Sequence, residues 1–484
     1  MAGVVRFLFA IMLCIANMII YGLKVNISTA IIGMVKRDNA STSGGGSEEC
    51  PEYLQDNGDD PTDLEGPFEW TSTQQGLIVS VYFAGYLVGM FPAGYLADRF
   101  NTKWVLLICV LGNAVLTLLV PAAANEIGVL LTLRFLTGLI SAANLPVVNV
   151  LVGKWVVYEE KSTWVGVIYS GTSLGTVVSI LSSGMILNYL GWEAVFYIHG
   201  ILPLIWCAVF LVFFADNPEE QRYITEEERH LLINSYGHRP PGVKKIKVPW
   251  KAIFSSVPFW ALIMTNMLGN FCWYFLLTQL PLYMNKMLRF DIKKNASISC
   301  APYLINAFVN PALGRVLDWG RKNGYWSQTQ GRKLAVAVSC IPPSVILLII
   351  AYIGCARTTT VILLCLSIVI CGAIFVGHLC NQNDLAPNYA GTLMGITNTP
   401  GTISAFVLPA LVGAITEDGH TFLRWRYIFW VNIIAQMLAF AVFTVFGSAK
   451  IQDWNYPEER PEESSPEALP PIKESKSKDL AQET

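Results

Sequence analysis

Long runs of apolar residues recur along the whole chain, and short polar segments separate them. Each run is about 20 residues long, the length that an α-helix needs to cross the hydrocarbon core of a bilayer. The runs are continuous, whereas the strands of a membrane barrel would alternate apolar and polar residues over about ten positions. The pattern predicts twelve membrane-spanning helices, at residues 7–33, 72–96, 104–124, 127–151, 163–187, 195–214, 257–282, 297–317, 334–353, 360–381, 389–415 and 427–447.

Three polar segments divide this all-α pattern. Residues 34–71 form a long first loop, residues 215–256 form a highly charged central linker, and residues 451–484 are rich in Pro, Glu, Ser and Lys. A tail of that composition is expected to be disordered. Six helices, a linker and six more helices are the pattern of a duplicated transporter, so we expect two six-helix halves at 1–214 and 257–450.

Composition supports a membrane protein. Only 14% of residues are charged and 53% are apolar, whereas an ordinary soluble domain is about 25% charged. The net charge of −2 argues against a nucleic-acid partner, and we expect a monomer whose main partner is the lipid bilayer. Most of the 11 cysteines lie inside apolar runs. A disulfide between Cys50 and Cys300, both near the predicted outer face, is left open.

The basic residues of the loops predict the orientation. Cytosolic loops of membrane proteins carry an excess of Lys and Arg. Four basic connections fall on the cytosolic side if both termini are cytosolic. The loop after residue 282 is also basic but would lie on the outer side. The basic residues on the majority side are Arg99, Lys103, Lys154, Lys161, Arg222, Arg229, Arg239, Lys244, Lys245, Lys247, Lys251, Arg315, Arg321, Lys322, Arg332 and Lys333.

Two glycosylation sequons agree with this orientation. Asn39-Ala-Ser lies in the first loop, and Asn295-Ala-Ser follows the seventh predicted helix. Both would face the exterior or the lumen, where an Asn-x-Ser triplet is an acceptor. We therefore predict a multi-pass protein of the plasma membrane or of an endolysosomal or vesicle membrane.

Two cations inside apolar helices are the best candidates for chemistry. Lys24 lies roughly 18 Å in from Lys36 along its helix, and Arg134 lies roughly 12 Å in from Glu126. No Asp or Glu occurs within the first six predicted spans. A charge at the bilayer centre costs roughly 2.5–3.5 kcal/mol, so it usually faces a cavity or a partner. The pair predicts an anion site, although snorkelling or bonds to helix carbonyls would also satisfy a cation.

A glycine and charges follow the second predicted helix as Gly94-Tyr-Leu-Ala-Asp98-Arg99, with Lys103 close behind. A counterpart, Gly314-Arg-Val-Leu-Asp318, follows the eighth helix. The first motif resembles the cytosolic signature of the major facilitator superfamily. Its repetition at the matching place of the second half supports a duplicated architecture.

Longer stretches resemble one family of that superfamily. They are Tyr21-Gly-Leu-Lys24, Leu277-Thr-Gln-Leu-Pro281, and Asn383-Asp384-Leu-Ala-Pro387 with the following Gly391 and Gly395. Together they are similar to the anion transporters of solute carrier family seventeen, nearest to its insect inorganic phosphate cotransporter-like branch. The resemblance, over residues 7 to 450, implies a major facilitator fold with no enzymatic activity. It also implies a small anionic solute, carried by alternating access.

The sequence departs from the family at three kinds of position. Lys24 stands where the family often has Arg, while Arg134 matches the family's arginine. Proton-coupled members carry glutamates where this chain has Thr137 and Ser141, and Asn149 replaces a histidine of some members. Hydroxyls do not titrate in the physiological range, so we expect transport driven by sodium or membrane potential. Proton coupling, through His378, remains the alternative.

Weaker candidates complete the site. Polar residues that could line the cavity are Asn270, Tyr274, Asn306 and Asn310, although such residues are as often glue between helices. Asn26, Ser28 and Asn144 could bind a coupling Na⁺. A membrane-embedded enzyme would need a nucleophile or a His/Asp/Glu constellation at membrane depth, and the sequence has none. A sensor that binds without transporting stays open as an alternative.

Overall fold

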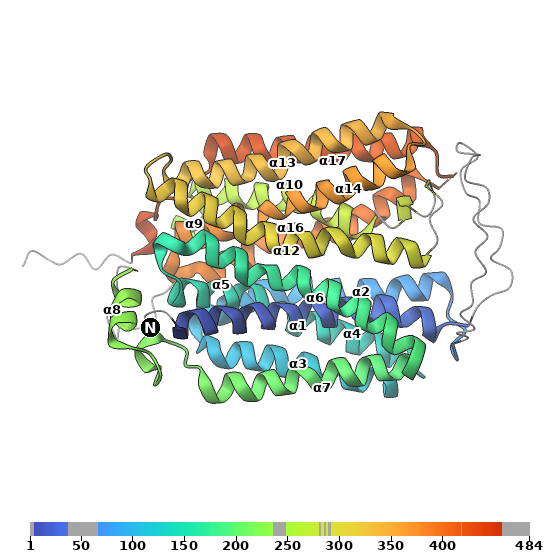
Figure 1. Cartoon of the computed structure of the whole chain (residues 1–484), viewed down its shortest axis with the longest axis horizontal. Helices are drawn as coiled ribbons and strands as arrows, with labels where there is room; N and C mark the ends of the chain where they lie inside the picture. Colours follow the sequence, from blue (N-terminus) through green and yellow to red (C-terminus); the bar gives the residue numbers. More distant parts are fainter. Residues whose placement is uncertain are drawn as a thin grey trace, which may run out of the picture.

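The computed structural model describes residues 4–36, 66–235, 248–279, 282–284, 287–288, 292–417 and 419–456. Its long helices run side by side along one direction (Figure 1). The N-terminus, α8 and α9 lie at one end of the bundle, which we call the linker end. The opposite end, where α1 finishes, is called the far end.

The first half holds six spans, one of them made of two helices. They are α1 (Val4–Met34), α2 (Ser72–Arg99), α3 (Thr102–Ala123), α4 (Ile127–Ser141) with α5 (Asn144–Trp155), α6 (Lys161–Leu190) and α7 (Trp192–Phe213). Two short helices follow in the linker: α8 (Glu226–Ser235) and α9 (Trp250–Phe254).

The second half repeats this arrangement. Its helices are α10 (Val257–Thr278), α12 (Ile292–Lys322), α13 (Gln328–Ile353), α14 (Arg357–Cys371) with the short α15 (Asn381–Leu385), α16 (Ala390–Ile415) and α17 (Phe422–Phe446). Eleven spans of the described chain are long and apolar enough to cross a membrane. The more polar α12 is equally long and lies among them, so the all-α fold with twelve spans is confirmed.

Side-chain caps define where several helices begin. Thr71 and Ser327 each accept a hydrogen bond from the backbone N–H three residues on. The glutamine at that position accepts a hydrogen bond from the backbone N–H of the capping residue. Asn101 and Thr421 cap α3 and α17 in the simpler way. Such caps satisfy N–H groups that have no partner inside the helix, which stabilises these starts by about 1 kcal/mol each.

Two helices that the sequence predicts as continuous are broken. The span predicted at 127–151 divides at residues 142 and 143, because Pro146 has no N–H to donate to the carbonyl of Ala142 and its ring crowds that carbonyl. The span predicted at 360–381 ends as an α-helix at Cys371 and continues through two 3₁₀ turns. There the carbonyl of Val376 accepts from Arg332 Nη1 at 2.6 Å.

The linker helix α8 packs on the first half. Glu228, 1% exposed, accepts a hydrogen bond at 2.8 Å from the backbone N–H of Arg6, in the first turn of α1. The Arg6 guanidinium pairs with Glu160 at 3.1 Å. A carboxylate at this position also favours the N-terminus of α1 through the helix dipole. The central linker therefore includes an ordered helix tied to the linker end.

The outer-face predictions fall mostly outside the described residues. Asn39 and Cys50 belong to that undescribed part, and so does the side chain of Asn295, whose backbone lies in the first turn of α12. Cys300 is a buried free thiol. The pairing of Cys50 with Cys300 is therefore wrong, and Cys355 is a disulfide-bonded cysteine.

Candidate functional site

Lys24 lies inside a group of aromatic rings. Its Nζ is 4.7 Å from the ring centroid of Phe83 and between 5.1 and 5.9 Å from those of four tyrosines. The tyrosines are Tyr21, Tyr82, Tyr86 and Tyr274. The negative face of an aromatic ring attracts an ammonium group. The rings therefore hold a cation at membrane depth without carrying a charge themselves.

Arg134 reaches the same group of rings from α4. Its side chain is 3% exposed, and its Cζ lies 5.2 Å from the ring centroid of Tyr82. Tyr82 thus stands beside both cations, because Lys24 Nζ is 5.8 Å from the same centroid. Along their helices, Lys24 is about 15 Å from the end of α1 and Arg134 about 10 Å from the start of α4. The structure brings the two predicted cations together.

Neither cation has an acidic partner among the described residues. No carboxylate lies within salt-bridge distance of Lys24 or Arg134, although the described chain holds several other ion pairs. Arg134 Nε is buried and makes no hydrogen bond to any residue that the structure describes. A planar guanidinium suits the bidentate binding of a carboxylate or phosphate group. The arrangement can attract and bind a small anion.

Two weaker candidates lie on α10 at different distances from this cluster. The Tyr274 ring is 5.9 Å from Lys24 Nζ and packs edge-on against Phe83. The Asn270 amide instead donates to Asn266 Oδ1 at 2.5 Å, one helical turn away on its own helix. Tyr274 therefore belongs to the cation cluster, whereas the one hydrogen bond described for Asn270 stays within α10.

The other two candidates, on α12, bind neighbouring helices. Asn306 Nδ2 donates to the carbonyls of Ile368 and Val369 at 3.2 Å each. Its Oδ1 accepts from Ser173 Oγ at 3.2 Å and from Asn310 Nδ2 at 2.6 Å. These bonds join α12 to α14 and α6. Hydrogen bonds of this kind hold membrane helices together, and the structure does not bring Asn306 or Asn310 to the two cations.

The polar residues of α4 and α5 are engaged in hydrogen bonds. Thr137 donates to the carbonyl of Leu133 at 2.7 Å, and Ser141 donates to Asn113 Oδ1 at 2.7 Å. Asn149 Nδ2 donates across the bundle to the carbonyl of Ala390 at 3.4 Å. None of the three side chains exchanges a proton near neutral pH, and each is engaged in a hydrogen bond within the bundle.

The sodium ligands suggested by the sequence do not form one site. Asn144 Nδ2 donates to Asn17 Oδ1 at 2.7 Å, so Asn144 lies beside residue 17 of α1. Asn26 lies nine residues farther along α1, about 13 Å away. A sodium ion and its oxygen ligands are only about 2.4 Å apart, as for other hard cations. Asn26 and Asn144 therefore cannot bind the same ion in this conformation.

The first signature motif connects the two halves. Asp98, at the end of α2, accepts hydrogen bonds from the backbone N–H groups of Gly391 at 3.0 Å and Thr392 at 2.6 Å. These groups open α16, and a carboxylate there is favoured by the free N–H groups and the helix dipole. Gly94 permits the close approach, since a Cβ atom would lie 2.5 Å from the Gly391 carbonyl oxygen.

The two basic residues of that motif make separate contacts. The Arg99 guanidinium lies 5.0 Å from the ring centroid of Tyr95, and Lys103 Nζ donates to the carbonyl of Leu211 at 2.9 Å. The backbone N–H of Lys103 donates to Asp216 at 3.0 Å. Lys103 therefore joins the start of α3 to the end of α7 and the residues that follow it, whereas the contact given for Arg99 stays within α2.

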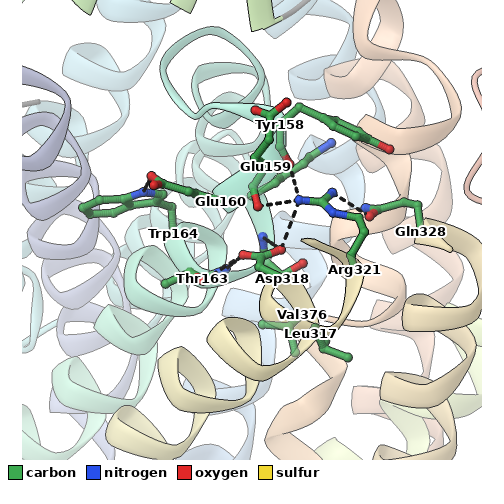
Figure 2. A network of polar contacts seen from close by, with 12 residues as sticks. Tyr158, Glu159, Glu160, Thr163, Trp164, Leu317, Asp318, Arg321, Gln328 and Val376 are labelled. Atoms are coloured by element: carbon green, nitrogen blue, oxygen red, sulfur yellow. Dashed lines mark hydrogen bonds and ion pairs between the residues drawn. The ribbon is translucent and has the colours of Figure 1, made fainter. Parts of the chain in front are cut away.

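The second motif makes the reciprocal connection (Figure 2). Asp318, at the end of α12, accepts from the backbone N–H groups of Ser162 at 3.2 Å and Thr163 at 2.7 Å, which open α6. Gly314 lies against Ser162, where a Cβ atom would overlap the carbonyl. Arg321 lies over the same turn and donates to the carbonyl of Tyr158 at 2.8 Å. Each half therefore holds the start of a helix in the other.

A buried ion cluster at the same end was missed by the sequence analysis. Asp384 pairs with Lys161 at 2.8 Å and with Arg332 at 2.7 Å, and all three side chains are at most 2% exposed. Lys161 belongs to the first half, whereas Asp384 and Arg332 belong to the second. We call these three residues the linker-end ion cluster. Asp384 belongs to the Asn383-Asp384-Leu-Ala-Pro387 motif quoted above, and this motif was the sequence feature that could have pointed to the cluster.

Known proteins resemble this chain over most of its length. The sequence model described as Major Facilitator Superfamily matches residues 7–409. Human sialin is 32% identical over 450 residues, covering 93% of this chain and 90% of that protein. A putative inorganic phosphate cotransporter of Drosophila melanogaster is 32% identical, covering 94% of this chain and 87% of the relative.

A solved structure resembles the fold. It is the major facilitator superfamily proton:xylose symporter XylE bound to 6-bromo-6-deoxy-D-glucose, with a TM-score of 0.65 and 12% sequence identity. The match covers 92% of this chain and 97% of that chain. At such identity the likeness concerns the fold alone, and it agrees with the two six-helix halves.

Proposed function

Because the chain belongs to the major facilitator superfamily and, within it, to solute carrier family seventeen, we propose that it carries a small organic or inorganic anion by alternating access. The anion would bind at Lys24 and Arg134, between the two halves. One observation carries the proposal. Two cations at membrane depth share the ring of Tyr82 and have no carboxylate partner among the described residues.

The contacts at the linker end support alternating access. In this conformation the halves are joined there by Asp98, by Asp318 and by the linker-end ion cluster. Transport would require these contacts to break so that the anion can leave on that side. A transporter of this kind moves one half against the other around a fixed site. The bonds to helix starts would then re-form on the return.

We propose that the linker end faces the cytosol, because most of the basic loop residues lie there. Trypsin added to the cytosolic face of sealed vesicles is expected to cleave the central linker at Lys244, Lys245 or Lys247. Trypsin on the other face should leave the linker intact. An Asn39→Gln variant should also lose mass if that residue carries a glycan. Cleavage of the linker only from the exterior would reverse the orientation.

The proposed energy source is sodium or the membrane potential. Thr137 and Ser141 hold the positions at which proton-coupled relatives carry carboxylates, and neither hydroxyl titrates near neutral pH. The membrane potential supplies about 2.3 kcal/mol per charge per 100 mV. A negative cytosol opposes anion entry, so uptake from outside favours sodium, whereas export or vesicle filling could use voltage alone. His378 is the alternative proton carrier, and its buried ring makes no hydrogen bond to the described residues.

The test is uptake by purified protein in proteoliposomes. Radiolabelled phosphate, glutamate, sialate and urate are supplied while sodium, pH and voltage are varied independently. We expect concentrative uptake of at least one anion under a sodium gradient or an imposed potential, and weak dependence on pH. Strong uptake driven by a pH gradient alone, with voltage clamped by valinomycin and no sodium, would contradict the proposed coupling and direct attention to His378.

The same experiment separates a transporter from a sensor on the same fold. A sensor would bind an anion, detected as a rise in the thermal unfolding midpoint, yet show no flux above empty liposomes. A ligand that binds only the folded state at 100 times its Kd stabilises it by about 2.7 kcal/mol. Binding without flux under every gradient would therefore favour the sensor.

A further inference from the structure

The rings around Lys24 come from both halves of the molecule. Tyr21 belongs to α1, and Tyr82, Phe83 and Tyr86 belong to α2, all in the first half. Tyr274 belongs to α10 in the second half, 5.9 Å from the ammonium nitrogen. Any movement that separates the halves near this level changes the surroundings of Lys24.

Phe83 differs from the other rings in two respects. Its centroid is the nearest to Lys24 Nζ, at 4.7 Å, and its side chain has no hydroxyl with which to bind a ligand. Phe83 also packs edge-to-face against two rings of the second half. The centroid distances are 6.2 Å to Tyr274 and 6.3 Å to Phe406, with interplanar angles of 87° and 80°.

Phe83 therefore has two kinds of contact: one with the Lys24 ammonium of the first half, and one with the rings of Tyr274 and Phe406 in the second half. Edge-to-face pairs are favourable because the positive edge of one ring meets the negative face of another. A cation over an aromatic face is favourable for the related reason that the face is negative. Phe406 contacts Phe83 but is not among the five rings around Lys24. Among the described ring contacts, the direct link from Phe406 to the Lys24 cluster is its contact with Phe83.

We propose that Phe83 is a positioning residue, which holds the Lys24 ammonium and links its position to the contact between the two halves. The proposal rests on the assignment of Lys24 to the anion site. When the halves are in contact through Phe406 and Tyr274, the ring is held and the ammonium stays over it. When they separate, the ring is free to turn and Lys24 is released toward the solute.

The consequence is a site whose affinity changes with conformation. Lys24 would be more accessible to solute when the second half has withdrawn than when its rings are in place. An anion site in a transporter needs such a difference, because a ligand shifts a conformational equilibrium only through differential affinity. In this proposal the ring of Phe83, which carries no charge, makes the anion affinity differ between the two conformations by holding Lys24 in one and releasing it in the other.

The test measures the reactivity of Lys24 and needs no anion. The purified full chain in proteoliposomes is treated briefly with acetic anhydride, and acetylation of Lys24 is quantified by mass spectrometry against exposed Lys251. Phe83→Leu is expected to raise acetylation of Lys24 by roughly 2- to 30-fold, the range between the loss of an exposed and of a desolvated cation–π contact. Phe83→Tyr keeps the aromatic face and should restore the original reactivity.

The link to the second half is tested with Phe406→Leu. This change is expected to raise Lys24 acetylation in the wild-type background and to add nothing in the Phe83→Leu background. Phe91→Leu, on the same helix but packed on Trp250, is the matched control and should change nothing. Thermal unfolding midpoints verify that each variant is folded.

Two results would overturn the proposal. One is unchanged acetylation in a folded Phe83→Leu variant. The other is an equal effect of Phe406→Leu with and without Phe83, which would mean a general opening of the bundle rather than a path through this ring. Either outcome leaves the anion-transport proposal standing, because that proposal depends on flux. Absence of flux would in turn leave the acetylation result unaffected.

Discussion

Arg134→Ala is expected to reduce anion uptake by about 100-fold or more while the protein still folds and reaches its membrane. A hydrogen bond to a charged group contributes about 1.5–3 kcal/mol, and each 1.4 kcal/mol is tenfold in affinity. A bidentate guanidinium makes two such bonds, so its loss removes most of the binding. Stability should not fall, because the described structure gives this buried cation no carboxylate to leave unpaired.

Two further variants define the role of Arg134. Arg134→Lys keeps the charge but loses the planar fork, and we expect uptake to remain severely impaired. Arg222→Ala is the control, because it removes an exposed arginine of the linker region. Initial rates in proteoliposomes, normalised to reconstituted protein, give the comparison. Wild-type flux in a well-expressed Arg134→Ala variant would exclude the residue from the site.

The second large effect is expected in the linker-end ion cluster. Lys161→Met removes the ion pair between the halves, while Asp384 keeps its bond to Arg332 within the second half. Loss of one charged hydrogen bond should shift the equilibrium toward an open linker end by about 10- to 100-fold. Asp384→Asn should be more damaging, because it removes the carboxylate that forms ion pairs with both buried cations of the cluster, at a cost of about 3–5 kcal/mol.

Cys380 provides the measurement. Its thiol is fully buried and lies 3.1 Å from Arg332 Nη2, so it becomes reactive only when this region opens. Maleimide labelling should rise in Lys161→Met, and the increase should vanish when Cys380→Ala is added. Arg229→Met removes an exposed ion pair and serves as the control. Labelling of Cys380 at the wild-type rate in Lys161→Met would mean that the ion pair does not hold the linker end closed.

The fold could be predicted from the sequence because lipid imposes a simple pattern. Apolar runs of spanning length give the helices, and the linker gives the division into halves. The helix break before Pro146 was missed, because hydropathy alone does not show whether a proline in an apolar run bends a continuous helix or ends one helix and begins another. At the interruption near Val376, the carbonyl of that residue accepts a hydrogen bond from Arg332, a partner that is distant in sequence.

The candidate site could be predicted only in part. Lys24 and Arg134 stand out because charges are rare inside apolar runs, and their role in binding remains a prediction. Of the rings around Lys24, only Tyr274 was named as a site candidate, because an aromatic residue that faces a cation has the same sequence context as one that faces lipid.

The linker-end ion cluster was missed for a geometric reason. Lys161, Arg332 and Asp384 each lie within three residues of a predicted span, and so they were counted as loop residues. Charges in such loops usually face water. Here the helices are longer than predicted, and the halves meet at that end, so these side chains are buried and paired with one another.

The bonds that Asp98 and Asp318 make to helix starts have a consequence for sequence variation. Each carboxylate accepts from backbone N–H groups, which every residue except proline provides. Residues 162, 163 and 392 can therefore change their side chains without losing these backbone bonds, although Thr163 would lose the additional bond from its Oγ1 to Asp318 at 2.8 Å, whereas the two acids cannot change. In a mutational scan, small residues such as Ala, Ser and Cys should be accepted at the buried Thr392 while proline is rejected for its missing donor, whereas nearly every substitution should be rejected at Asp98.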